Sequence, residues 1–223
     1  MSVVGIVPAA GRGERLGADG PKAFVVCAGR PLIEWSLDVL SEVCDRVVVA
    51  VPEGMAYPDS VTGGPVRSDS VRRAVEAAPE ADVYVVHDAA RPFVTAELVE
   101  HCIREVRDGW DGAIAAARMT DTVKEADAQG RVQRTLDRST LWAIQTPQAF
   151  IAGALRRALD QPLELLRAAT DDAALVERSG GSVRVVEAPP SNFKITTRED
   201  LELADRSLLR RAAATSPPRT SAP

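Results

Sequence analysis

The sequence has few cysteines, no long apolar run and no excess of positive charge. Its three cysteines, Cys27, Cys44 and Cys102, lie far apart and show neither Cys-x-x-Cys nor Cys/His spacing. They therefore predict neither a disulfide framework nor a zinc site, and we expect them to be reduced and buried. No stretch approaches the roughly 18 consecutive apolar residues of a membrane span. Residues 1–7 lack a basic leader, so we expect a cytoplasmic protein.

The formal net charge is −5 over 223 residues, which argues against a nucleic-acid coat or a membrane-surface protein. Such a chain repels phosphate ligands as a whole, so a phosphate site would need lysines and arginines concentrated locally. The proportions of apolar residues (45%) and charged residues (26%) are those of a soluble globular protein. We expect a single domain over residues 1–210 and a disordered tail over residues 211–223, which is rich in Ser, Thr, Pro and Ala.

Short β-branched runs alternate with longer helical patterns, which predicts an α/β fold with a mostly parallel sheet covered by helices. Thr95 is a candidate helix cap, and residues 197–200 form a candidate capping box. The expected strands are Val3–Val7, Arg46–Val51, Val83–Val86, Gly112–Ala117 and Val183–Glu187. The expected helices are Leu32–Leu40, Ser68–Ala78, Thr95–Val106, Phe150–Leu159, Asp171–Ser179 and Thr197–Leu209.

A β-hairpin is expected within about residues 119–140. Two runs, Thr122–Ala126 and Arg131–Leu136, flank a turn at residues 127–130. Few of these residues are apolar, and an isolated hairpin is marginal in water. The segment is therefore either a surface flap or an arm that leans on a second subunit.

A glycine-rich loop, Pro8–Gly17, follows the first expected strand. Glycines at this place let backbone N–H groups approach an anion closely. The spacing G-x-G-x-x-x-G is one residue longer than the dinucleotide fingerprint, and the G-K-[ST] ending of a P-loop is missing. The loop alone is also compatible with a plain strand-to-helix turn. Arg15 and Lys22 favour phosphate binding, because they add charged donors where phosphates would lie.

The hexapeptide His87–Pro92 follows an expected internal strand. Ligands of open α/β sheets collect outside the carboxyl ends of the strands, and a carboxylate there can hold Mg²⁺ directly or through water. Asp88 is therefore a candidate metal ligand, although Asp88 with Arg91 could equally form a structural ion pair. His87 is more often a satisfied structural histidine than a catalyst, and the sequence has no serine nucleophile elbow.

Polar motifs also recur through the second half of the chain. Together with the loop at Pro8–Lys22, the stretch Gly63–Val71 and the hexapeptide, they match one known pattern from residue 3 to about residue 209. Each motif is common, but all of them in this order are highly specific. The distal motifs are Asp121–Lys124, Asp137–Arg138, Gln145–Gln148, Ala169–Ala173 and Asn192–Thr196. In this order the sequence resembles the 2-C-methyl-D-erythritol 4-phosphate cytidylyltransferase family of the non-mevalonate isoprenoid route.

The resemblance implies a Rossmann-like α/β fold, with helices on both faces of a twisted sheet, and a homodimer in which the hairpin arm reaches into the neighbouring subunit. It implies transfer of CMP from CTP to the alcohol phosphate, with Mg²⁺ as cofactor. The implied catalytic residues are Arg15, Lys22, Lys194 and Asp88, with Asp88 also serving the metal. The implied CTP-binding residues are Pro8, Ala9, Ala10, Gly11, Gly13, Gly63, Gly64, Arg67, Ser70 and Ala89. The implied residues for the sugar-alcohol phosphate are Arg91, Thr122, Arg138, Thr146 and Thr170.

Two positions depart from the family pattern. Pro65 stands where relatives often carry a polar or acidic residue, which removes any side-chain contact to the base, and Ala23 stands where glutamine is usual.

A related cytidylyltransferase acting on ribitol 5-phosphate is the nearest alternative function. Ala90, where those relatives tend to have valine, favours the methylerythritol enzyme. A non-catalytic nucleotide-binding module is a second alternative, and the complete charged set argues against it.

Overall fold

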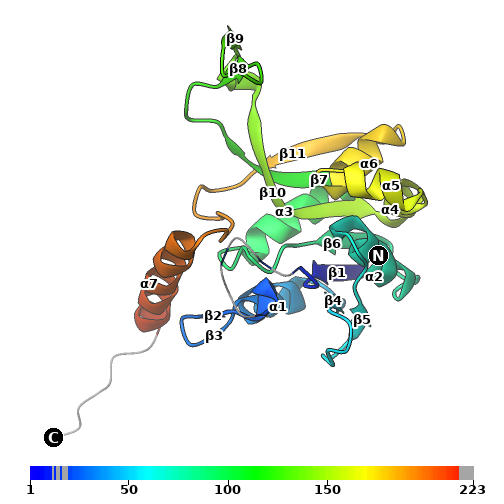
Figure 1. Ribbon diagram of the computed structural model, residues 1–223. Helices are drawn as coiled ribbons and strands as arrows, with labels where there is room; N and C mark the ends of the chain where they lie inside the picture. Colours follow the sequence, from blue (N-terminus) through cyan, green and yellow to red (C-terminus); the bar gives the residue numbers. More distant parts are fainter. Residues whose placement is uncertain (12, 14–15, 17–19, 216–223) are drawn as a thin grey trace, which may run out of the picture.

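The fold is described from a computed structural model over residues 1–11, 13, 16 and 20–215, with side chains through Arg211 (Figure 1). Its centre is a sheet of seven strands in the order β11-β7-β10-β6-β1-β4-β5. The strands are β1 (Val3–Pro8), β4 (Arg46–Val51), β5 (Ser60–Thr62), β6 (Val83–Val86), β7 (Gly112–Arg118), β10 (Trp142–Ile151) and β11 (Val183–Glu187). All neighbours pair in parallel except β10, which is antiparallel to both β6 and β7.

Helices cover both faces of this sheet, because its strands bury side chains on both sides. In β1, Val3 and Val7 belong to one apolar cluster, whereas Val4 and Ile6 belong to another. This alternation is the two-residue period of a strand. Helices α1 (Leu32–Val43) and α3 (Ala96–Arg107) pack on the first cluster. Helices α2 (Arg67–Glu76), α4 (Ala152–Leu159), α5 (Leu163–Ala168) and α6 (Asp172–Arg178) pack on the second. The Rossmann-like arrangement is thus confirmed.

A third apolar cluster lies beside the sheet. It joins the last helix, α7 (Arg198–Thr215), to the small hairpin β2 (Val26–Cys27) and β3 (Arg30–Pro31) through Leu16, Cys27 and Leu208. All three cysteine thiols are buried, and burial raises the pKa of Cys27 to about 11 and that of Cys44 and Cys102 to about 12. Within the described part of the chain, no helix combines the length and apolar character needed to cross a bilayer.

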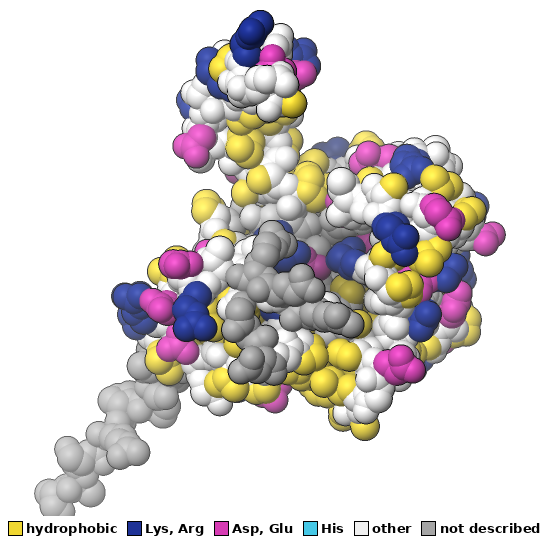
Figure 2. All heavy atoms as spheres, viewed as in Figure 1, with side chains coloured by type: hydrophobic (Ala, Val, Ile, Leu, Met, Phe, Trp, Pro, Cys, Tyr) yellow, Lys and Arg dark blue, Asp and Glu magenta, His cyan; other side chains and the backbone are white. Residues whose placement is uncertain are grey.

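The hairpin projects from the body. Strands β8 (Lys124–Ala126) and β9 (Val132–Thr135) form a two-stranded sheet of their own within the described residues, and every one of their residues is exposed. Figure 1 shows the hairpin at the far end of long extensions from β7 and β10, and Figure 2 shows it as a separate lobe with basic side chains around its tip. The expected projecting hairpin is present.

Several expected elements need correction. The helix expected at Phe150–Leu159 begins only at Ala152, because Phe150 and Ile151 end the unpredicted strand β10. The short elements β5 and α5 were not predicted either. Helix α7 continues to Thr215, so residues 211–215 are helical rather than disordered, and residues 216–223 lie outside the described residues.

The two expected helix caps, at Thr95 and at residues 197–200, are confirmed. The Thr95 hydroxyl accepts a hydrogen bond from the Leu98 N–H. At α7, the Thr197 hydroxyl accepts from the Asp200 N–H, and the Asp200 carboxylate accepts from the Thr197 N–H. This reciprocal pair is the capping box that the sequence predicts.

Candidate active site

A cavity of about 1580 Å³ opens at the carboxyl ends of β1 and β6, the edge where open α/β sheets collect ligands. All ten predicted CTP-binding residues line it, and so do Lys22, Asp88 and Lys194. The predicted catalytic residue Arg15 lies outside the described residues. Among the described residues, the cavity wall comes from five parts of the chain that are far apart in the sequence. They are residues 8–13 with 20–23, residues 52–53, residues 62–73, residues 88–90 and residues 194–196.

The glycine-rich loop lets Lys22 approach its backbone. Gly13 has φ +66°, and a Cβ there would stand 2.5 Å from Lys22 Cβ. The Lys22 N–H also donates to the Gly11 carbonyl at 3.3 Å. Leu16, which is 4% exposed, anchors the loop in the third apolar cluster. Glycine is required at position 13 both by its left-handed backbone and by the closeness of Lys22.

The Gly63–Gly64 segment forms a second backbone wall of the cavity. A Cβ on Gly63 would collide with Ala10, and a Cβ on Gly64 would collide with Asp69. The Ser70 hydroxyl accepts from the Gly64 N–H at 3.0 Å and donates to the Val66 carbonyl at 3.2 Å. Ser70 thus supports this segment from behind.

Arg73 and Asp69 hold the same segment from α2. The Arg73 guanidinium donates to the Gly63 carbonyl at 3.1 Å, and its Nε lies 3.2 Å from Asp69 Oδ2. The side chain of Asp69 is 2% exposed and also contacts Arg72. Sequence reasoning did not single out Arg73, because its position in α2 resembles that of any helical surface arginine.

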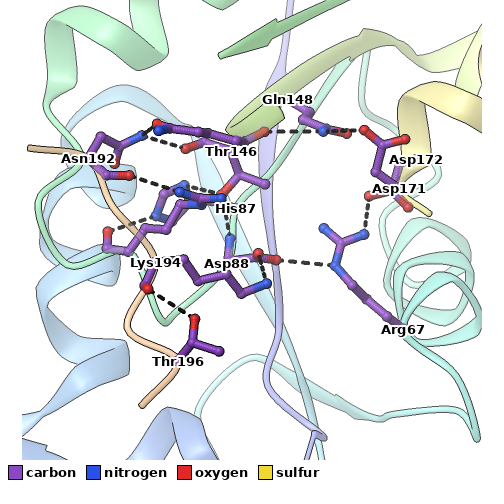
Figure 3. Close-up of polar contacts among 12 residues, drawn as sticks. Arg67, His87, Asp88, Thr146, Gln148, Asp171, Asp172, Asn192, Lys194 and Thr196 are labelled. Atoms are coloured by element: carbon purple, nitrogen blue, oxygen red, sulfur yellow. Dashed lines mark hydrogen bonds and ion pairs between the residues drawn. The ribbon is translucent and has the colours of Figure 1, made fainter. Parts of the chain in front are cut away.

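An ion cluster surrounds Asp88 at the cavity floor (Figure 3). Arg67 Nε lies 3.1 Å from Asp88 Oδ1, and Lys194 Nζ lies 2.6 Å from Asp88 Oδ2. Burial alone would raise the pKa of Asp88, but the two cations hold it well below its ordinary value. Asp88 is therefore an ionised carboxylate on the cavity wall. Asp88 forms no direct ion pair with Arg91; among the described residues its ion-pair partners are Arg67 and Lys194.

Arg67 has a second carboxylate partner that the sequence did not reveal. Its Nη1 lies 2.6 Å from Oδ2 of Asp172, the first residue of α6, and the Asp172 side chain is fully buried. Burial raises the pKa of Asp172, against the opposing effect of the Arg67 guanidinium. No spacing rule pairs two residues that are 105 positions apart.

His87 is a buried link beneath Asp88, as the structural interpretation predicts. Its Nε2 lies 3.2 Å from the Arg91 carbonyl, which can only accept, so we assign the ring hydrogen to Nε2. Its Nδ1 then accepts from the Thr146 hydroxyl at 3.1 Å, and that hydroxyl accepts from the Asp88 N–H at 3.0 Å. Burial lowers the pKa of His87 to about 4, so the ring is neutral near pH 7.

Asn192 ties the Lys194 segment to this floor. Its side-chain amide donates to the Gln145 side chain at 2.8 Å and to the Thr146 carbonyl at 3.0 Å. Arg91 donates to the Asn192 carbonyl at 2.9 Å. The segment is thus fixed by buried polar contacts on both sides of Lys194, because the Ile195 N–H also donates to the Ala90 carbonyl.

The predicted residues for the sugar-alcohol phosphate are not gathered at the cavity. Arg91 and Thr146 are 7% and 4% exposed, and they hold neighbouring groups beneath its floor. Thr122 and Arg138 are exposed on the hairpin, where Arg138 donates to the Thr120 carbonyl. Thr170 is exposed just before α6. None of the five lines the cavity within the described residues.

The cavity offers a limited donor set for a metal. Among the described residues, no three His, Cys, Asp or Glu side chains are grouped as a metal site would require. Asp88 is nevertheless ionised and faces the cavity. Mg²⁺ in nucleotide sites commonly takes one or two carboxylates together with substrate phosphates. The residues present therefore fit a cation that is held jointly by Asp88 and by the phosphates of a bound nucleotide.

Known proteins resemble this chain over nearly its whole length. A sequence model of the family described as 2-C-methyl-D-erythritol 4-phosphate cytidylyltransferase matches residues 3–210. The protein of that name from Nocardia farcinica is 45% identical over 95% of this chain and 96% of its own length. The one from Rubrobacter xylanophilus is 41% identical over 93% of this chain and 95% of its own. The crystal structure of the Thermus thermophilus protein of that name superposes with a TM-score of 0.80 at 35% identity, covering 94% of this chain and all of that one. The chain belongs to the 2-C-methyl-D-erythritol 4-phosphate cytidylyltransferase family.

Proposed function

We propose that this chain transfers CMP from CTP to 2-C-methyl-D-erythritol 4-phosphate, giving 4-diphosphocytidyl-2-C-methyl-D-erythritol and pyrophosphate for non-mevalonate isoprenoid biosynthesis. The family membership supports the reaction. One observation of the structure carries it: charged side chains from four distant chain segments line one cavity at the sheet edge where nucleotides bind in α/β folds. They are Lys22, Arg67, Asp88 and Lys194.

The reaction needs no general base. A phosphate monoester has a second pKa near about 6, so the attacking oxygen is already anionic at neutral pH. That oxygen forms a bond to the α-phosphorus of CTP while the bond from this phosphorus to the β-phosphate oxygen breaks, and pyrophosphate leaves. Buried His87 fits this scheme, since both of its ring nitrogens are engaged in the floor. Catalysis then consists of positioning and charge neutralisation.

The cations would offset the repulsion between two anionic substrates. Unscreened repulsion between them in a cleft of low dielectric is on the order of several kcal/mol. We assign Lys22, together with Arg15, to the triphosphate and the transition state. We assign Lys194 to the phosphates from the opposite side, since its ammonium already lies at Asp88 on the floor. The glycine-rich loop and the Gly63–Gly64 segment would frame the nucleotide with backbone groups.

Mg²⁺ is the proposed cofactor, with Asp88 as its protein ligand, direct or through water. When bound with CTP it would neutralise charge on the triphosphate. The role of Asp88 follows from its ionised state at the cavity, where Arg67 and Lys194 hold the carboxylate in place.

The site for the alcohol phosphate would be completed by a second copy of the chain. Thr122 and Arg138 lie on a hairpin that stands away from the body of its own chain (Figure 1). We therefore propose a cytoplasmic homodimer in which this arm reaches the partner's cavity. Arg91, Thr146 and Thr170 are proposed for the same substrate. The first two would act mainly by fixing the cavity floor.

The proposal is tested by measuring pyrophosphate release from CTP and Mg²⁺ with 2-C-methyl-D-erythritol 4-phosphate, with ribitol 5-phosphate, or with no acceptor. Release with the methylerythritol substrate well above the other two is expected. Faster release with ribitol 5-phosphate would assign the chain to the related ribitol activity. No release with either acceptor, despite CTP binding, would indicate a non-catalytic nucleotide-binding module.

A further inference from the structure

Arg67 is fixed by two carboxylates from separate elements (Figure 3). Its Nε lies 3.1 Å from Asp88 Oδ1, after β6, and its Nη1 lies 2.6 Å from Asp172 Oδ2, at the start of α6. The third nitrogen, Nη2, has no hydrogen bond to the described residues, and Arg67 lines the cavity with 31% of its side chain exposed. A guanidinium is planar, so two anchored nitrogens fix the direction of the third.

Asp172 is not needed to begin α6. Asp171 already caps this helix, because its carboxylate accepts from the Ala174 N–H at 2.9 Å, and it also accepts from the Gln148 side chain at 2.9 Å. Asp172 instead carries a fully buried carboxylate whose Oδ1 has no hydrogen-bond partner among the described residues. A buried ion pair with an unsatisfied oxygen is a poor source of fold stability.

The pairing also limits what Arg67 can do to Asp88. A guanidinium readily forms two parallel hydrogen bonds with one carboxylate. With Asp172 in place, only Nε reaches Asp88. Without Asp172, Arg67 could turn two nitrogens of one edge onto Asp88, which would withdraw the guanidinium from the cavity and mask the carboxylate.

We infer that Asp172 is a positioning residue for nucleotide binding: it holds Arg67 so that Nη2 faces the cavity and offers a donor to the bound nucleoside triphosphate. The inference rests on the proposed function, in which CTP is that ligand. Asp172 itself does not line the cavity, and it acts only through Arg67.

The test compares Asp172→Asn with Asp171→Asn, an adjacent change of the same charge on the same helix. CTP binding is measured by calorimetry without the acceptor, so that no turnover occurs. Asp172→Asn is expected to raise the Kd for CTP about tenfold, the scale of one hydrogen bond to a charged group. Asp171→Asn is expected to lower Tm through loss of the helix cap, with a change in Kd of about twofold or less.

A double-mutant cycle separates positioning from a general defect of α6. In an Arg67→Ala background, Asp172→Asn should have no further effect on the Kd for CTP, whereas a structural defect would persist. Asp172→Glu, which keeps the charge but lengthens the side chain, supplies a second variant with the same expected direction should Asp172→Asn fold poorly.

The two proposals fail in different ways. Absence of CTP binding by the wild-type protein would contradict the proposed function. Wild-type binding of CTP with an unchanged Kd in folded Asp172→Asn or Asp172→Glu, or an equal loss in Asp171→Asn, would overturn the role of Asp172.

Discussion

Gly13→Ala tests whether the glycine-rich loop exists to admit Lys22. Gly13 has φ +66°, where alanine costs about 1–2 kcal/mol relative to glycine. The added Cβ would stand 2.5 Å from Lys22 Cβ. Overpacking of this kind adds about 1–3 kcal/mol if Lys22 stays in place. The free energy of unfolding should therefore fall by about 2–5 kcal/mol.

The collision can also be relieved by moving Lys22. Ordinary contact needs a separation of 3.4–4 Å, so the shift is on the order of 1 Å. Misplacement by that distance can lower kcat by about 10²-fold. Gly13→Ala should thus lose stability if Lys22 stays in place, kcat if Lys22 moves, and part of each if Lys22 moves only partly.

Gly29→Ala is the matched control. Gly29 has φ +81° in the turn between β2 and β3, and an added Cβ would have no atom of the described residues within 4 Å. It should lose only the backbone cost of about 1–2 kcal/mol and keep its kcat. Urea unfolding and steady-state kinetics on both variants decide the matter. Equal stability and equal kcat in the two variants would refute the argument that Gly13 makes room for Lys22.

Three further predictions address other parts of the site. Arg73→Ala should raise the KM for CTP about tenfold with kcat nearly unchanged, because the Gly63 carbonyl loses its donor; an unchanged KM would remove Arg73 from the nucleotide wall. His87→Gln should flatten the pH dependence of stability. Burial lowers the pKa of His87 to about 4 in the folded protein, against 6.5 in the unfolded chain. As pH falls from 6.5 to 4, the free energy of unfolding should therefore fall by about 3 kcal/mol more in the wild type than in the variant. Urea-unfolding profiles that stay parallel over this pH range would contradict this. Arg138→Ala should raise the KM for the alcohol phosphate and leave that for CTP nearly alone; equal damage to both would indicate a misplaced arm.

Local patterns were enough to predict most of the sheet, the glycine-rich loop with Lys22, and Asp88. The rest of the nucleotide side, from Gly63–Gly64 to Lys194, came from the family resemblance. Alternating burial in strands such as β1 and the caps at Thr95 and Thr197 depend on neighbours in the sequence, so they can be read directly. Strand β10 was missed because Pro147 argues against a central strand. In the structure the register shifts between Ile144 and Gln148, so Pro147 falls where no regular ladder bond is required.

The remaining features depend on the folded chain. Asp172 meets Arg67 only because the folded chain brings the first residue of α6 to the first residue of α2, and no sequence spacing encodes that meeting. The same holds for the Thr146 hydroxyl beneath Asp88. The arm residues Thr122 and Arg138 could be identified by resemblance, but in the described chain they are exposed on the hairpin and do not line the cavity.

The fate of the α-phosphorus tests the central claim most directly. CTP labelled with ³²P at the α-position is incubated with the protein, Mg²⁺ and 2-C-methyl-D-erythritol 4-phosphate, and the products are separated. Transfer of CMP predicts that the label appears in a cytidine diphosphate adduct of the alcohol, while a γ-label appears in pyrophosphate. Recovery of the α-label only as unreacted CTP or free CMP would contradict the account.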